Sequence, residues 1–310
     1  MKNLQTPLCT LVGCELPIVQ APLGSTTSVE LVAAVCEAGG LGMLAGTWLD
    51  PDELGAAIAR VRAATTRPFG VNLVLHWDQA ERLQVCLDGG VRVISLCWGD
   101  PSEHVAACHS AGARLLHTVA TAAEARRVVD LGVDCVVAQG SEAGGHVWGE
   151  VSTFPLVPAV VDAVSPVPVV AAGGIADGRG LAAALALGAA GAWLGTRFVA
   201  SAEAHAHPGW QHGIVEASER STLMTTLFDR GWEEAPERVL RTPLVEAWMA
   251  AGCPGGERHG DTPPLRWDPS PELRAQYAGQ SAALVHDVAP AGELVRRIAR
   301  EAEATLQALA

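Results

Sequence analysis

Short apolar runs rich in valine, isoleucine and leucine alternate with longer alanine-rich stretches along most of this chain. Apolar runs of this length between turn residues are typical of buried strands. Eight such runs occur, at 17–21, 42–45, 69–75, 91–96, 114–119, 135–139, 167–172 and 191–195. The stretches between them predict helices over 28–38, 51–64, 78–88, 101–111, 121–131, 153–164 and 178–188.

Local signals support the predicted helix boundaries. Asp50-Pro51 and Thr121, with Glu124 three residues later, are typical of helix starts. Strands that alternate with helices pair in parallel, and eight such units favour an α/β fold of the closed (β/α)8 or TIM-barrel type. An open doubly wound sheet is the alternative, but the glycine fingerprint of its dinucleotide-binding members is missing after the first strand, which continues Q-A-P-L-G-S.

The alternation of strands and helices stops after the eighth strand. We therefore expect a barrel domain over residues 1–200, a smaller capping subdomain over 201–275, and a C-terminal segment over 276–310 that returns to the barrel. The cap is expected to contain short helical pieces, such as 218–226, and a Pro/Gly-rich stretch at 252–271. Residues 289–309 form an amphipathic pattern that predicts the last barrel helix.

Composition limits the classes of function. The 310 residues are 49% hydrophobic and 18% charged, which is enough for a large core. The net charge of −13 argues against a nucleic-acid partner or an anionic membrane surface. No apolar run reaches the roughly 18 residues of a membrane span, and the first residues do not resemble a signal peptide. A cytoplasmic protein is expected.

The reactive side chains exclude two further chemistries. Lys2 is the only lysine, so an enzyme that forms a Schiff base on lysine is not expected. The eight cysteines contain no C-x-x-C pair and several lie in apolar runs, which indicates buried thiols in the reduced state. Cys108-His109, with His104 nearby, is too weak a pattern to predict a metal site, and none is expected.

Active sites of TIM barrels lie at the C-terminal ends of the strands. The residues that the pattern places there are Ala21, Pro22, Leu23, Asn72, His117, Thr118, Gln139, Ala172, Gly173, Gly174, Gly195 and Thr196. Gly173-Gly174 and Gly195-Thr196 follow the seventh and eighth strands, where barrels often bind phosphate through backbone N–H groups. The simpler interpretation is that these glycines only permit tight turns.

Two amides and one histidine add to this set. Asn72 and Gln139 end apolar strands, where an amide suits either a planar heterocycle with mixed donors and acceptors or the local backbone. A flat cofactor with a phosphate tail, bound without lysine, points to flavin mononucleotide (FMN). The loop E-A-G-G-H after the sixth strand then presents His146, whose ordinary pKa near 6.5 suits acid–base work.

The motifs of this chain resemble those of the nitronate monooxygenase family, formerly called 2-nitropropane dioxygenases. The similar stretches are P-I-V-Q-A-P-L at 17–23, A-G-G-L-G-M-L-A at 38–45, F-G-V-N-L at 69–73, Q-G-S-E-A-G-G-H at 139–146, V-A-A-G-G-I-A-D-G-R-G at 170–180, L-G-T-R-F at 194–198 and A-G-Q-S at 278–281. The resemblance implies a TIM barrel that binds FMN and acts on a small molecule together with O₂.

The resemblance also implies residue roles. His146 would be the catalytic residue, either as a base towards a neutral nitroalkane or as a partner of an anionic nitronate. The residues implied in cofactor binding are Ala21, Pro22, Leu23, Asn72, His117, Gln139, Gly144, Gly145, Ala172, Gly173, Gly174, Gly195, Thr196 and Gln280. The chain departs from the family at Leu23, where methionine is usual, and at Val147-Trp148-Gly149 after the histidine. Trp148 is expected to add an apolar wall near the substrate, which favours a bulkier or different substrate.

Three functions stay open at this point. The first is oxidation of an alkyl nitronate or nitroalkane by FMN and O₂, which yields a carbonyl compound and nitrite. The second is an NAD(P)H-dependent FMN reductase that acts on a quinone or an enoyl thioester, since the flavin-dependent enoyl-ACP reductases resemble this chain in the same motifs. The third is a flavin carrier without catalysis. Tryptophans in 201–275 are expected either to line the substrate mouth or to form a homodimer.

Overall fold

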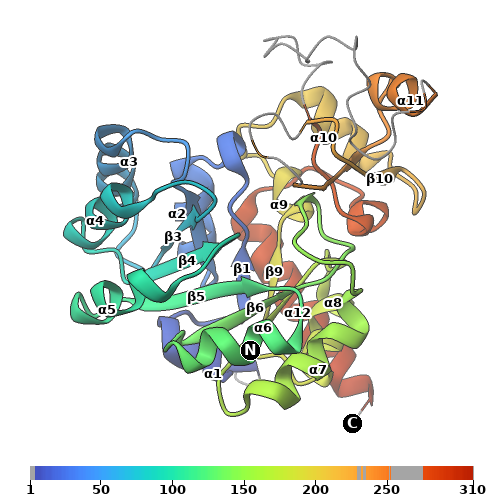
Figure 1. The fold of residues 1–310 in the computed structure, drawn as a ribbon. Coiled ribbons are helices and arrows are strands. Elements are labelled where there is room, and N and C mark those ends of the chain that lie inside the picture. Colours follow the sequence, from blue (N-terminus) through green and yellow to red (C-terminus); the bar gives the residue numbers. More distant parts are fainter. Residues whose placement is uncertain (1–3, 229–231, 233–234, 251, 253–274, 310) are drawn as a thin grey trace.

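The computed structural model of the chain describes residues 4–228, 232, 235–250, 252 and 275–309. Eight parallel strands form a closed barrel in the order β1-β2-β3-β4-β5-β6-β8-β9 (Figure 1). Their bounds are β1 Ile18–Gln20, β2 Leu41–Ala45, β3 Gly70–Val74, β4 Val93–Cys97, β5 Arg114–Val119, β6 Cys135–Gln139, β8 Val169–Ala172 and β9 Gly191–Leu194. The predicted TIM barrel is confirmed, and each predicted strand overlaps an observed one.

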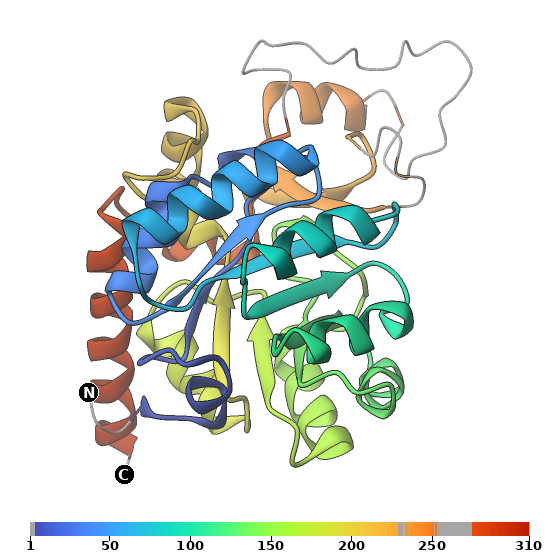
Figure 2. The same cartoon turned by 90° about the vertical axis from the view of Figure 1, so that its left-hand side faces the viewer.

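A ring of helices covers the barrel. They are α2 Val29–Glu37, α3 Pro51–Ala64, α4 Ala80–Asp88, α5 Ser102–Ser110, α6 Ala122–Asp130, α7 Thr153–Val164 and α8 Gly178–Ala186. The C-terminal helix α12 (Ala291–Leu309) completes the ring by packing against α8 and α2, and Figure 2 shows it along the outside of the barrel. A short helix α1 (Pro7–Val12) precedes the first strand.

Capping residues fix where these helices begin. Asp50 accepts a hydrogen bond from the Glu53 N–H at 2.8 Å, and the Glu53 side chain accepts one from the Asp50 N–H, which completes a capping box. Thr121 caps α6 in the same way, with its Oγ1 atom accepting from the Glu124 N–H at 3.1 Å. Both helix starts lie where the sequence predicts them.

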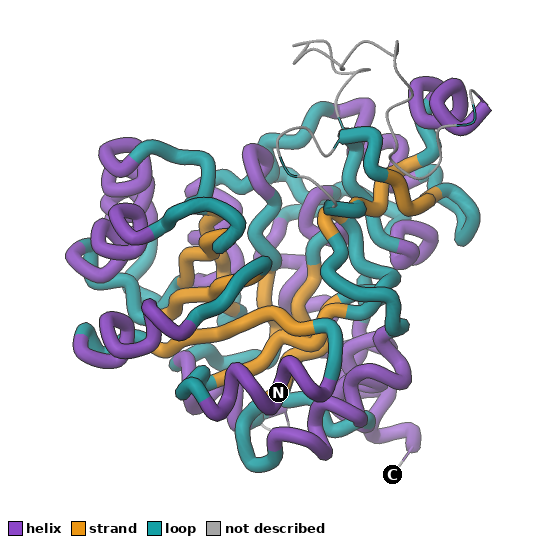
Figure 3. The backbone as a smooth tube through the Cα atoms, viewed as in Figure 1, coloured by secondary structure: helices purple, strands orange, loops and turns teal. Residues whose placement is uncertain are grey.

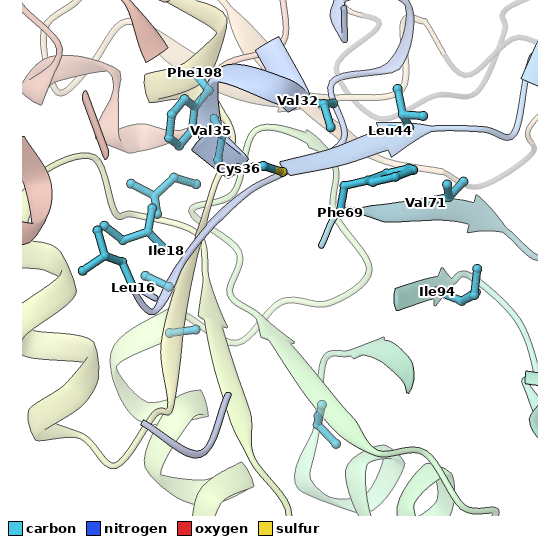
Figure 4. Packing of buried hydrophobic residues seen from close by; sticks show 14 of the residues in the cluster. Leu16, Ile18, Val32, Val35, Cys36, Leu44, Phe69, Val71, Ile94 and Phe198 are labelled. Carbon is cyan, nitrogen blue, oxygen red and sulfur yellow. The ribbon is translucent and has the colours of Figure 1, made fainter. Parts of the chain in front are cut away.

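The side chains of each barrel strand alternate between two apolar layers, as the period of two requires. On β5, Leu116 points into the barrel, whereas Leu115 points outward against the helices. The outer layer is the larger one, and Figure 4 shows part of it, including Ile18, Leu44 and Val71. This alternation determines which strand-end residues reach the barrel mouth.

A second, smaller sheet lies beyond the barrel strands. It contains β10 (Thr222–Thr225), β11 (Glu237–Leu240) and β7 (Gly145–His146), in the order β10-β11-β7. Figure 3 colours all strands orange and the loops between them teal. The helices of this region are α9 (Thr196–Val199), α10 (Pro208–Val215) and α11 (Pro243–Ala250), and two 3-10 turns are Gly24–Thr26 and Gln280–Leu284. Because β7 belongs to the His146 loop, this sheet ties that loop to the segment that follows the barrel.

The prediction of a helical piece at 218–226 is wrong. Residues 222–225 form strand β10, because Leu223 and Thr225 are buried while Thr222 and Met224 are partly exposed, a period of two rather than 3.6. The Pro/Gly-rich stretch at 252–271 lies outside the described residues except for Gly252. The domain limits at 200 and 275 stay a prediction.

No helix among the described residues is long and apolar enough to cross a membrane.

Candidate active site

A cavity with a volume of about 1580 Å³ opens at the C-terminal end of the barrel strands. It exceeds the roughly 300–1,000 Å³ of common ligand sites, so it has room for more than one small ligand. Thirteen of the predicted residues line it: Ala21, Pro22, Leu23, Asn72, Gln139, Gly144, Gly145, His146, Ala172, Gly173, Gly174, Gly195 and Thr196. The structure therefore brings almost the whole predicted set together around one space.

His117 does not reach the cavity, contrary to the prediction. It follows Leu116, which points into the barrel, so the alternation of β5 turns His117 outward and gives the cavity wall to Thr118. His117 is 4% exposed, and its Nδ1 atom has no hydrogen-bond partner among the described residues. Burial lowers the pKa of His117 to about 4, with a smaller contribution from Arg127.

Gln280 is the second predicted residue outside the cavity. Its side chain is exposed, and its neighbours Gly279 and Ser281 line the cavity instead. The Gln280 N–H donates to the Glu142 carbonyl at 2.9 Å, which holds the A-G-Q-S segment against the E-A-G-G-H loop by its backbone. The motif therefore contributes a close backbone contact rather than an amide side chain.

The glycines of the site have different functions. Gly144 lies against the 278–279 backbone so closely that an added Cβ would stand 2.4 Å from the Gly279 nitrogen. Gly173 and Gly174 have φ values of +98° and +73°, which L side chains rarely adopt, and both line the cavity. At Gly195 an added Cβ would meet only Ala21 and Leu23, at 3.6 and 3.8 Å. Gly173, Gly174 and Gly195 thus expose bare backbone to the cavity, as an anionic ligand group requires.

The two amides are held differently. Asn72 Nδ2 donates to the carbonyl and the hydroxyl of Ser95 at 3.2 and 3.1 Å, and its Oδ1 has no partner among the described residues. Gln139 Nε2 donates to the His146 carbonyl at 3.1 Å, while its Oε1 accepts from the Trp148 N–H at 3.0 Å. Asn72 can therefore accept a hydrogen bond from a ligand, whereas Gln139 shapes the His146 loop.

His146 lies at the junction between the barrel and the small sheet. It pairs with Glu237 across β7 and β11, and its Nδ1 atom lies 3.2 Å from the Ala235 carbonyl oxygen and 3.5 Å from Glu237 Oε2. Both neighbours are acceptors, so Nδ1 carries the proton and Nε2 is the basic nitrogen. Burial lowers the pKa of His146 to about 4, and the hydrogen bond to Ala235 opposes this shift. The imidazole is therefore neutral at neutral pH.

Glu237, which the structure places beside His146, is not identified from the sequence. Its side chain is fully buried, and its Oε1 atom accepts a hydrogen bond from the Phe228 N–H at 2.8 Å. In the sequence it belongs to E-R-V-L, an unremarkable charged start of a short strand within a segment that matches no motif. Only the pairing of β11 with β7 places this carboxylate beside His146.

Tryptophans form the wall of the cavity beyond His146. The Trp232 ring lies 4.1 Å from His146, and Trp98 lies 4.7 Å from Trp232 between ring centroids. Trp148 packs on Trp98 at 4.7 Å and does not itself line the cavity, so the expected apolar wall is made by Trp98 and Trp232. Within 201–275, the described tryptophans Trp210, Trp232 and Trp248 all line the cavity. The homodimer stays a prediction.

Other polar side chains line the cavity, among them Cys97, His205, His207 and Tyr277. No group of histidine, cysteine and carboxylate side chains within the described part of the chain could hold a metal ion. The seven described cysteines are free, and all but the partly exposed Cys97 are buried. His146, which also lines the cavity, has a buried carboxylate, Glu237, beside it.

This fold and this site define a (β/α)8 enzyme that binds its ligands at the C-terminal end of the barrel. The chain belongs to the nitronate monooxygenase family: a sequence model of that family matches residues 5–81 and 77–301. A nitronate monooxygenase of Paraburkholderia phytofirmans is 32% identical over 97% of this chain and 96% of its own length. The protein is thus a flavin-dependent oxidoreductase, as the resemblance of its motifs implies.

Other relatives differ in the reaction that they are named for. A (3aS,4S,5R,7aS)-5-hydroxy-7a-methyl-1-oxo-octahydro-1H-indene-4-carboxyl-CoA dehydrogenase of Mycobacterium tuberculosis is 42% identical, over 79% of this chain and 68% of its own length. Among solved structures, FabK from Thermotoga maritima has a TM-score of 0.88 at 36% identity and covers 98% of both chains. A nitroalkane oxidase from Streptomyces ansochromogenes has a TM-score of 0.83 at 31% identity, covering 98% of this chain and 99% of that one.

Proposed function

We propose that this protein is an FMN-dependent oxidoreductase that oxidises carbon acids, with a nitroalkane or its alkyl nitronate as substrate. With O₂ the products are a carbonyl compound and nitrite. The observation that carries the proposal is the pair of His146 and Glu237, whose Nδ1 and Oε2 atoms lie 3.5 Å apart at the cavity. The family match and the structural similarity to a nitroalkane oxidase support this substrate class.

The cavity residues fit FMN. The bare backbone of Gly173, Gly174 and Gly195 would hold its phosphate and ribityl chain, and Asn72 Oδ1 would accept a hydrogen bond from its polar edge. Ala21 and Leu23 offer an apolar surface to its ring system. Bound FMN supplies the two-electron oxidation of the substrate.

His146 supplies the proton chemistry. A neutral imidazole with Nδ1 protonated has a free lone pair on Nε2, and it can accept the proton of a carbon next to an electron-withdrawing group. The imidazolium formed in this step lies beside the Glu237 carboxylate, which stabilises the positive charge by Coulomb attraction and holds the ring in one tautomer.

A neutral nitroalkane suits this site better than a preformed nitronate. An anionic substrate beside His146 would also lie near Glu237, and an ionised carboxylate at that position would repel it. A neutral substrate avoids this repulsion until its proton has moved to His146. The proposal is therefore that deprotonation happens inside the cavity.

The test compares nitrite release from nitropropane and from its preformed nitronate, in wild type and His146→Asn. Removing a general base costs about 10²–10⁴-fold in rate. We expect this loss with the neutral nitroalkane and a much smaller loss with the nitronate, which needs no base. Equal losses with both substrates, at unchanged FMN content, would exclude His146 as the base.

A second candidate substrate is an acyl or enoyl thioester. Its support is the 42% identical relative, which is named a carboxyl-CoA dehydrogenase, together with a cavity that exceeds common ligand sites. The same base could remove a proton next to a thioester carbonyl, and the reverse reduction would need NAD(P)H. Steady-state turnover of NADH with crotonyl-CoA or a quinone, without nitrite formation from any nitroalkane, would favour this candidate.

A further inference from the structure

The cavity does not end at the barrel mouth. It continues between helices α2 and α3, which lie next to each other on the outside of the barrel (Figure 2). We call this extension the α2–α3 crevice. It is lined by Val29, Leu44, Leu49, Ala56 and Ala57, with Glu53 and Arg60 at its edges.

One face of α3 forms the side of the α2–α3 crevice. Glu53, Ala56, Ala57 and Arg60 follow the spacing i, i+3, i+4, i+7, so they share one stripe of the helix. The two central positions carry only methyl groups, which leaves space where a larger side chain would fill it. Leu44, on the outward face of β2, adds an apolar floor (Figure 4).

The polar groups at the edges of the crevice already have partners. Glu53 Oε2 accepts from the Asp50 N–H at 3.2 Å as part of the capping box. Arg60 Nη2 lies 3.0 Å from Glu30 Oε1 on α2, with both side chains largely exposed. The interior thus offers apolar surface without unsatisfied donors or acceptors, which suits a hydrocarbon chain better than an amide-containing one.

Tryptophan rings lead from His146 to the α2–α3 crevice. Trp232 lies 4.1 Å from His146, Trp77 lies 5.0 Å from Trp232, and Trp48 lies 4.5 Å from Trp77, between ring centroids. All three line the cavity, and Trp48 is followed directly by Leu49 of the crevice. An elongated ligand with its reacting end at His146 would meet apolar surface along this whole path.

We propose that the α2–α3 crevice binds the unbranched hydrocarbon tail of the substrate, and that the natural substrate is a long-chain aliphatic compound. The inference rests on the proposed function only in that the reacting end of the chain lies at His146. The α2–α3 crevice determines which chain lengths the enzyme prefers, whichever electron-withdrawing group the reacting end of the substrate carries.

The test measures binding of unreactive n-alkanols to the FMN-loaded protein by calorimetry, with n-hexanol, n-octanol and n-decanol as probes. Each buried methylene strengthens binding about three- to fourfold. We expect this increase in wild type and in Ala59→Phe, because Ala59 is an exposed residue of the same helix that does not line the cavity. In Ala56→Phe and Ala57→Leu we expect the affinity to stop rising with chain length.

Two variants, Ala56→Phe and Ala57→Leu, are used so that misfolding of one does not leave the proposal without a test. Ala56 is exposed on the cavity side, so its replacement does not disturb the core, whereas Ala57 also packs against the main core. Melting temperature and FMN content serve as folding controls for both. Equal chain-length dependence in all four proteins, or none in wild type, would overturn the inference. Because alkanols are not oxidised in this assay, failure of nitroalkane turnover alone would overturn the proposed function and leave the crevice proposal standing.

Discussion

Glu237 lies directly opposite His146 in the antiparallel pair of β11 and β7, with its Oε2 atom 3.5 Å from the Nδ1 atom of the histidine. The two residues come from separate segments, one after β6 and the other after β9. The Val147 N–H donates to the Pro236 carbonyl at 2.9 Å and continues the pairing by one residue. The position of His146 therefore depends on the segment that follows the barrel strands.

Replacing the buried carboxylate tests its effect on His146. An ionised carboxylate beside an imidazole stabilises the protonated ring by Coulomb attraction. In Glu237→Gln we expect kcat for a neutral nitroalkane to fall about 10- to 100-fold, with KM little changed. Turnover of the preformed nitronate should not fall, because this substrate needs no base. A matched loss with both substrates would show that Glu237 has only a structural role.

The variant Gly144→Ala tests the backbone contact between the His146 loop and the C-terminal segment. An alanine there would place its Cβ 2.4 Å from the Gly279 nitrogen and 2.7 Å from the Ala278 carbonyl carbon. Such overpacking costs about 1–3 kcal/mol, so we expect a lower melting temperature in thermal denaturation.

Gly55→Ala is the control for that measurement. Gly55 lies within α3, and an added Cβ would meet only Val85 Cγ1 at 3.7 Å, an ordinary contact. Because alanine favours a helix over glycine by about 0.5–1 kcal/mol, this variant should be as stable as wild type or slightly more stable. Gly144→Ala and Gly55→Ala with the same melting temperature would contradict the close contact.

A substitution at Gly195 is expected to weaken FMN binding without changing the stability of the protein. The Gly195 φ of −100° is accessible to any residue, and an added Cβ would touch the protein only at ordinary distances of 3.6 and 3.8 Å. Gly195→Val should therefore leave the melting temperature of the FMN-free protein nearly unchanged. The branched side chain would occupy cavity space, so we expect FMN, followed by fluorescence quenching, to bind at least about tenfold more weakly, which equals 1.4 kcal/mol. Unchanged FMN affinity would place the cofactor elsewhere.

The burial of His117 should make the stability of the protein depend on pH. Its pKa is lowered by burial to about 4 in the folded protein, against about 6.5 in the unfolded chain. Between these values the unfolded state binds the proton and the folded state does not, so the free energy of unfolding decreases as pH falls from 6.5 to 4. The full effect is on the order of 3 kcal/mol.

The variant His117→Leu removes this titration. The measurement is urea denaturation of wild type and variant at several pH values across the same range. We expect the difference in unfolding free energy between the two to shift in favour of His117→Leu as the solution is acidified. A difference that is constant with pH would mean that His117 is not buried in its neutral form.

The periodic parts of the fold were predictable from the sequence. Strands such as β6 and helices such as α3, with its Asp50-Pro51 start and capping box, combine a clear apolar period with local signals at their ends. Most of the predicted site residues could then be found at the strand ends, because parallel strands in a barrel all end on one face.

The cap was not predictable in the same way. Strand β10 is four residues long, and its period of two is too short to distinguish from a helical turn. His117 was misplaced because a residue's position at a strand end does not say which side of the sheet it faces. Glu237 had no signal of its own, since its importance comes from long-range pairing with β7.

The central claim is that FMN in this cavity is reduced by a carbon acid that His146 deprotonates. The most direct measurement is the visible flavin absorbance of the FMN-loaded protein under anaerobic conditions, after adding neutral nitropropane. We predict rapid bleaching in wild type, and in His146→Asn bleaching only by the preformed nitronate. Bleaching by NADH with no response to either nitro compound would contradict the account and assign the protein to the reductases.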